Sequence, residues 1–130
     1  MAALDTHVLV RIITRDHPEQ TAKAQAFVTA LGLEGAYIPP MVLLETVWIL
    51  ERAYRWSTFD IQQALHITAH CGSFRLDDTA LKAIELFRKE GARGVGFADC
   101  LALQTVSDKH QGPMATFDPK LGALPGVRKL

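Results

Sequence analysis

Four acidic residues lie within or beside apolar segments, and their types and spacing are the best indication of chemistry in the sequence. Asp5 directly follows the apolar residues 2–4, and Asp118 follows Phe117 near the other end of the chain. Glu45 and Asp99 also have mainly apolar neighbours. Burying a carboxylate costs free energy unless it is paired or binds a metal ion. The four acids together therefore suggest a site for a divalent cation.

Two of these acids, Asp5 and Asp118, are expected at the carboxyl ends of strands. Residues 2–4 are expected to form a strand that ends at Asp5, and residues 113–117 form the last clear strand, which ends before Asp118. Ligands of open parallel sheets bind at the carboxyl ends of the strands, and neighbouring strands are roughly 4.8 Å apart. Two carboxylates at such ends can share one hard cation, whose oxygen ligands lie at about 2.1 Å for Mg²⁺.

Glu45 is expected on a helix from about residue 41 to residue 54. Its neighbours three and four positions away include Trp48 and Ile49, so we expect its side chain to lie on the core-facing side of that helix. A buried ion pair with Arg52 is the alternative role for this acid.

Asp99 lies at or near the start of a helix expected over residues 97–110, where the helix dipole favours a carboxylate. It therefore has a simpler alternative role as a helix cap. Asp118, which precedes Pro119, has the alternative role of a turn residue. No cap or turn is evident at Asp5.

Short apolar runs alternate with amphipathic helical stretches, which predicts βα units around a parallel sheet. Residues 7–13 either extend the first strand or begin a helix, because periodicity alone does not separate the two. The other elements expected are strands at 36–38 and 74–76, and helices from Asp16–Pro18 to Gly32, from Ser57 to about Gly72, and from Asp77 or Asp78 to Gly91, the last with Leu81, Ile84 and Phe87 on one face.

Length and composition indicate a single domain spanning residues 1–130. The 14 basic and 14 acidic residues give no net charge, which argues against a protein that coats nucleic acid by charge alone. Arg11, Arg15, Arg52 and Arg55 are nevertheless candidates for phosphate contacts. The start shows no signal-peptide pattern and no apolar run is long enough for a membrane span, so a cytoplasmic protein is expected.

Histidine and cysteine offer a weaker metal motif. His66 and His70 are four residues apart on an expected helix, beside Cys71, but no second pair completes a zinc site. Cys71 and Cys100 are expected to be small buried hydrophobic residues.

The acids and their neighbours resemble those of PIN-domain proteins, and within that superfamily the VapC-type toxins of type II toxin–antitoxin systems. The resemblance runs through the whole chain in the family's order. It is carried by residues 4–11 (LDTHVLVR), 43–45 (LLE), 97–103 (FADCLAL) and 116–118 (TFD).

This resemblance implies a three-layer α/β/α fold with a central parallel sheet, and a ribonuclease that depends on Mg²⁺ or Mn²⁺. Asp5, Glu45, Asp99 and Asp118 match the family's catalytic acids, with Asp5, Asp99 and Asp118 as metal ligands. Asp118 would bind a second metal ion or position the first through water, and Glu45 would complete the site or orient water. Thr6 and Thr116 match supporting hydroxyl residues.

The family further implies an RNA substrate, a cognate VapB-type antitoxin and a homodimer. Two other functions are compatible with the residues. One is a non-catalytic α/β module for protein binding, in which the acids are structural. The other is a phosphoacceptor receiver-like domain, although no convincing lysine ends a strand.

Overall fold

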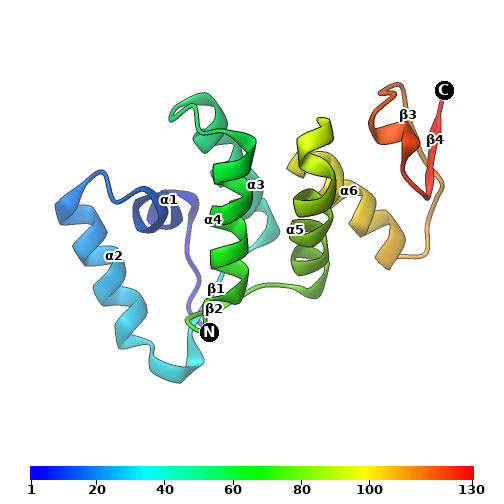
Figure 1. Ribbon diagram of the computed structural model, residues 1–130. Helices are drawn as coiled ribbons and strands as arrows, with labels where there is room; N and C mark the ends of the chain where they lie inside the picture. The colour runs from blue at the N-terminus through cyan, green and yellow to red at the C-terminus, as the bar shows by residue number, and fades with distance from the viewer. The chain divides into compact units, whose positions relative to one another are not determined.

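The computed structural model describes residues 1–130, which group into two compact units, Met1–Asp77 and Asp78–Leu130. Each unit contains its own helices and its own pair of parallel strands, as Figure 1 shows by label and colour. No helix is long and apolar enough to cross a lipid bilayer.

The first unit has four α-helices. Its two short strands pair in parallel, with Ala36 opposite Phe74, and Ala3 adds an isolated parallel bridge to Tyr37. The elements of this unit are α1 (Thr6–Thr14), α2 (Pro18–Ala30), η1 (Gly32–Glu34), β1 (Ala36–Tyr37), α3 (Pro40–Arg52), α4 (Thr58–His70) and β2 (Phe74–Arg75).

Polar side chains cap the N-termini of three of these helices by accepting hydrogen bonds from backbone N–H groups. Asp5 caps α1, the His17 ring caps α2, and Ser57 caps α4 by accepting from the backbone of Asp60. Such caps satisfy donors that have no partner within the helix. The expected start signals at Asp16–Pro18 and Ser57 are thus confirmed.

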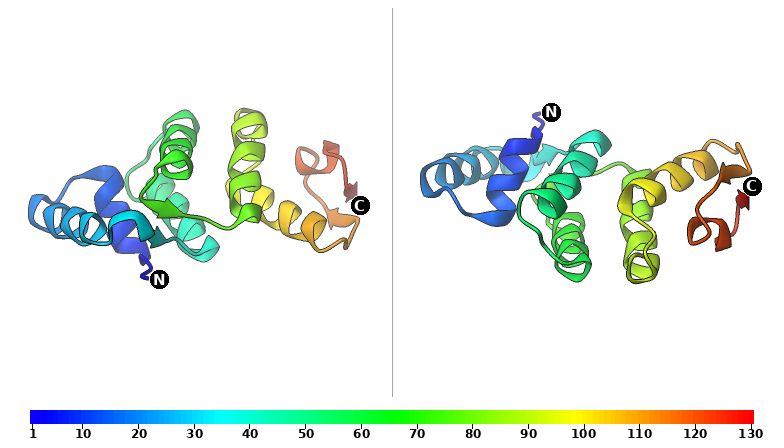
Figure 2. Two further views of the ribbon diagram at one scale, coloured as in Figure 1. Left: turned by 90° about the horizontal axis from the view of Figure 1, so that it is seen from below. Right: turned by 90° about the horizontal axis from the view of Figure 1, so that it is seen from above.

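The core of the first unit forms where α1 packs on α2 and α3, and α3 packs on α4 (Figures 1 and 2). Burial of these apolar side chains is the main stabilising contribution. The largest fully buried side chains are Leu9, Val10, Ile38, Leu43, Leu50, Ile61 and Leu65.

The second unit consists of two packed helices followed by a short parallel pair of strands. Phe87 and Phe97 meet edge to face, with ring centroids 5.8 Å apart, inside the contact between the helices. The elements are α5 (Asp78–Glu90), η2 (Gly91–Arg93), α6 (Phe97–Asp108), β3 (Met114–Thr116), η3 (Leu121–Ala123) and β4 (Val127–Lys129).

The α/β class with parallel strand pairing is confirmed. Residues 7–13 belong to a helix, α1, and the strand expected at residues 2–4 is reduced to the bridge at Ala3. The expectation that residues 113–117 form the last strand was wrong, because β4 follows and pairs with β3. Of the three residues grouped on one face of α5, Ile84 and Phe87 are buried, whereas Leu81 is 37% exposed.

Candidate functional site

Asp5 is exposed and occupies the N-cap position of α1. Its Oδ1 accepts a hydrogen bond from the backbone N–H of Val8 at 3.0 Å. Sequence reasoning found no capping role here, and the structure corrects this. Only Leu4 and Asp5 separate the bridged Ala3 from α1, and Asp5, directly before the first helical residue, supplies the cap.

A groove of about 600 Å³ lies beside Asp5, between α1 and α2. Lys23 and Phe27 of α2 line it together with His7 of α1. The sequence analysis missed Lys23, although its spacing of four from Phe27 places both on one side of a helix. The ion pair of Lys23 with Glu19 is solvent-exposed and therefore weak, so its ammonium remains accessible beside the groove.

Glu45 lies on α3 and is exposed, so its expected position on the core-facing side was wrong. The buried face of α3 is formed instead by Leu43, Thr46, Val47 and Leu50. Glu45 also makes no ion pair with Arg52, whose guanidinium lies 5.7 Å from the centre of the Trp48 ring. Its carboxylate is therefore free to bind a ligand.

Asp99 is the third residue of α6 and is half-buried. The N-cap position belongs to Gly96, which has no capping side chain, so the alternative role of Asp99 as the cap does not apply. Burial raises the pKa of Asp99, and the negative charge of Asp118 raises it further.

Asp118 lies between β3 and η3, where its side chain orders a turn. Its Oδ1 accepts from the backbone N–H of Lys120 at 2.8 Å, and its own N–H donates to Thr116 Oγ1 at 3.0 Å. The turn role is therefore real. Thr116 supports Asp118 directly, whereas the other supporting candidate, Thr6, is buried in the first turn of α1.

Within the second unit, Asp118 lies close enough to Asp99 for its negative charge to raise the pKa of the Asp99 carboxyl. Asp5, the N-cap of α1, and Glu45, on α3, belong to the first unit, in which these two helices pack together. No group of three or more His, Cys, Asp or Glu side chains is placed to hold a metal ion. The Asp99–Asp118 pair nevertheless fits a hard divalent cation, because its donors are oxygens and a cation would relieve the repulsion between them.

The arginines proposed for phosphate contacts have different environments. Arg11 donates to Gln20 at 2.7 Å and to the Tyr54 hydroxyl at 3.1 Å, and forms an ion pair with Asp16. These contacts connect α1, α2 and the end of α3, so Arg11 has a structural role. Arg15 and Arg55 are exposed where the backbone adopts a left-handed conformation, each with φ of 54°.

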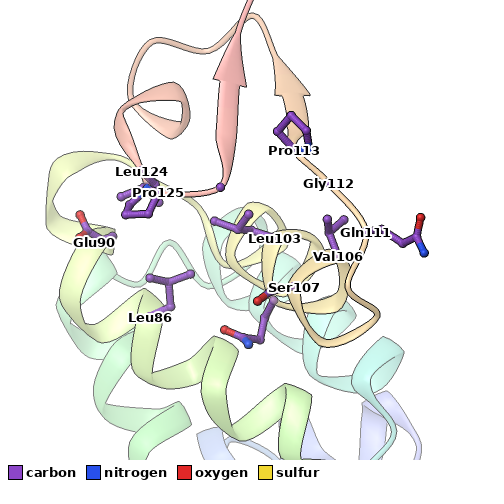
Figure 3. Close-up of a pocket in the computed structure, with 12 residues that line it drawn as sticks. Leu86, Glu90, Leu103, Val106, Ser107, Gln111, Gly112, Pro113, Leu124 and Pro125 are labelled. Carbon is purple, nitrogen blue, oxygen red and sulfur yellow. The ribbon is translucent and has the colours of Figure 1, made fainter.

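Neither Asp99 nor Asp118 lines the large cavity of the second unit. This cavity, of about 540 Å³, is bordered by Leu86 of α5, Leu103 of α6 and the segment at Leu124 and Pro125, as Figure 3 shows. Its walls are mostly apolar, and none of the predicted catalytic residues contributes to them.

Comparison with known proteins gives a family for the whole chain. Residues 2–127 match the model of the PIN domain. A related protein, the VapC ribonuclease of Aquifex aeolicus (strain VF5), is 28% identical over 116 residues, which cover 86% of this chain and 82% of the relative. No solved structure matches the chain. The matched region contains all four predicted acids, and the chain therefore belongs to the PIN domain family.

Proposed function

We propose that this protein is a metal-dependent endoribonuclease, the toxin of a VapBC-type type II toxin–antitoxin pair. The proposal is carried mainly by the match to the PIN domain over residues 2–127, which includes all four acids. The relative named VapC ribonuclease supports the choice of RNA as substrate. The charge of Asp118, which raises the pKa of Asp99 in addition to the effect of burial, supports metal binding by these carboxylates.

In this proposal Asp5, Asp99 and Asp118 bind Mg²⁺ or Mn²⁺, and Glu45 completes the site or orients the attacking water. When bound, such a cation supplies a water of lowered pKa and neutralises charge on the phosphate. Thr116 holds the turn that presents Asp118, through its hydrogen bond to the backbone of that residue. Thr6, the buried first residue of α1, remains a supporting candidate next to Asp5.

Lys23 borders the groove that Asp5 also lines. Arg11 lines the same groove but is held by its contacts within the fold, so Lys23 is the basic residue placed best for the substrate. An ammonium group there favours approach of a phosphate backbone. The proposal further includes a VapB-type antitoxin, a homodimer and a cytoplasmic location, where RNA targets and antitoxin are both present.

The test is cleavage of end-labelled RNA by the purified protein. We expect EDTA to stop cleavage and added Mn²⁺ or Mg²⁺ to restore it. Asp99→Asn is expected to abolish cleavage while the circular dichroism spectrum stays that of the wild type. Cleavage that survives EDTA, or that Asp99→Asn leaves unchanged, would contradict the proposal.

Glu45 allows a matched comparison within one helix. Glu45→Gln is expected to lower the cleavage rate strongly, because it removes a negatively charged oxygen donor. Glu51→Gln removes a charge that is also exposed on the same helix, and it is expected to leave the rate unchanged. Equal rates for the two variants would remove Glu45 from the proposed site.

A further inference from the structure

Two histidines form an exposed pair near the end of α4. The ring centroids of His66 and His70 are 4.2 Å apart and the ring planes differ by 35°. Both residues are exposed to solvent. Residues four apart on a helix lie on the same side, one turn apart, so the pair is presented together.

A hydrogen bond fixes the tautomer of the His70 ring. His70 Nδ1 lies 2.9 Å from the backbone carbonyl oxygen of His66. Because a carbonyl oxygen only accepts, Nδ1 carries the hydrogen, and in the neutral ring Nε2 carries the free lone pair. Histidines that bind metals are commonly oriented by this type of contact with a backbone carbonyl.

The surroundings of the pair favour a cation. His70 is the last residue of α4, where the carbonyl groups of the helix end give partial negative charge. The ring nitrogens of His66 have no protein partner. The adjoining Gly72 has open space around it, with no atom within 4 Å of an added Cβ.

We propose that His66 and His70 form a binding site for a borderline divalent transition-metal ion, of the class of Ni²⁺, Cu²⁺ or Zn²⁺, with water at the remaining positions. Imidazole nitrogens suit these ions, whereas carboxylate oxygens suit Mg²⁺ and Mn²⁺. The site is therefore chemically different from the acids of the proposed nuclease, and it does not depend on that function. Sequence spacing alone argued against a zinc site, because a second pair of ligands is missing. The structure adds three observations in favour of a metal ion: the ring geometry, the tautomer of His70 and the position at the helix end.

The test is an NMR titration of the full chain, without an affinity tag, with paramagnetic Ni²⁺. We expect the ring signals of His66 and His70 to broaden at lower Ni²⁺ than those of His7, His17 and His110. Excess Mg²⁺ is expected to leave this broadening in place, because Mg²⁺ competes for oxygen donors. The wild-type chain is also expected to be retained on an immobilised Ni²⁺ column.

Three variants make the test specific. His66→Gln and His70→Gln are each expected to lose column retention and the early broadening of the remaining ring. Glutamine is a good helix former and both positions are exposed, so melting curves are expected to match the wild type. His110→Asn removes a histidine elsewhere, with a residue that tolerates the left-handed backbone there, and retention is expected to persist.

Equal broadening of all five histidines, or retention that survives His66→Gln, would overturn the proposal. Asp99→Asn separates this inference from the nuclease proposal. That variant is expected to lose RNA cleavage and to keep the Ni²⁺ response of His66 and His70. Loss of the Ni²⁺ response in Asp99→Asn would place the bound ion at the carboxylates and would refute the histidine site.

Discussion

Asp5 combines a structural role with the chemical role proposed for it. One carboxylate oxygen accepts the hydrogen bond from Val8 that begins α1, and the other oxygen has no protein donor. The capping role needs only an acceptor, which an amide also provides. The metal-binding role needs the negative charge. The two roles are therefore separable by substitution.

We predict that Asp5→Asn and Asp5→Ala differ in stability but not in activity. Asp5→Ala is expected to lower the free energy of unfolding by about 1 kcal/mol because the cap is lost, whereas Asp5→Asn is expected to unfold like the wild type. Both are expected to abolish RNA cleavage. Urea denaturation and the cleavage assay measure the two effects. Full cleavage by Asp5→Asn would contradict the proposed role of the charge.

The sequence singles out four candidate acids and the turn at Asp118, but it did not reveal the environment of Glu45. Glu45 has the apolar neighbours Trp48 and Ile49, which suggested a buried position. Trp48 is itself 58% exposed, and the buried side of α3 runs through Leu43, Val47 and Leu50. A helix with apolar residues on two sides does not reveal which side packs, because only the neighbouring elements decide this.

Helices were easier to predict than strands, and the reason is physical. The starts of α2 and α4 follow from local signals, because a capping side chain and the helix it begins are adjacent in sequence. The strands are two or three residues long and depend on pairing with distant segments. Within β4, Arg128 and Lys129 give no apolar signal, so this strand was missed.

Asp108 joins α5 to α6, and its contribution to stability is expected to depend on pH. Its carboxylate accepts from Thr79, from Gln104 at 2.9 Å and from Lys82 at 3.3 Å. The Thr79 hydrogen bond lowers the pKa of Asp108 most, followed by the bond from Gln104 and the contacts with Lys82. A lowered folded-state pKa gives stability that is present above the unfolded value of 3.8 and is lost as the pH falls through the folded value.

We therefore predict that Asp108→Asn lowers the melting temperature at pH 7, and that this difference shrinks as the pH falls below about 4. Thermal unfolding followed by circular dichroism at several pH values measures the effect. Asp60→Asn, at an exposed position of α4, is the control and is expected to show a smaller difference. A deficit for Asp108→Asn that stays constant down to pH 2 would argue against the carboxylate as its cause.

Gly35 provides a prediction for the pairing of β1 with β2. A Cβ at Gly35 would lie 2.8 Å from the backbone oxygen of Ser73, and the φ of Gly35 is +72°. That oxygen also accepts from Ala36 at 2.9 Å, so it cannot move away without loosening the strand pair. Gly35→Ala is expected to destabilise by more than about 1 kcal/mol in urea denaturation.

Gly32→Ala is the matched control for this substitution. Gly32 has a similar φ of +61°, but an added Cβ would meet nothing within 4 Å. Its cost is therefore limited to backbone strain. Similar losses for the two variants would show that the contact with Ser73 does not matter.

For the whole molecule, length and composition predicted one domain but gave no sign of the division at Asp77. The PIN match spans both units, and the second contains only about fifty residues, a size at which a lone core is marginal. We predict that residues 1–130 unfold in a single transition. In scanning calorimetry, the calorimetric and van't Hoff enthalpies are then expected to agree. Two resolved transitions would show that the units unfold independently.

The two cysteines differ so much in environment that we expect only one thiol of the chain to react with labelling reagents. Cys100 is fully buried in α6, and burial, with smaller contributions from Asp99 and Glu90, raises its pKa to about 12. Its thiolate is scarce at neutral pH, and maleimide reagents are not expected to modify it in the native state. Cys71, at the end of α4, is only partly buried. Mass spectrometry after labelling is expected to find one dye, on Cys71, which would then report fluorescence quenching by Cu²⁺ from beside His70 without any cysteine replacement.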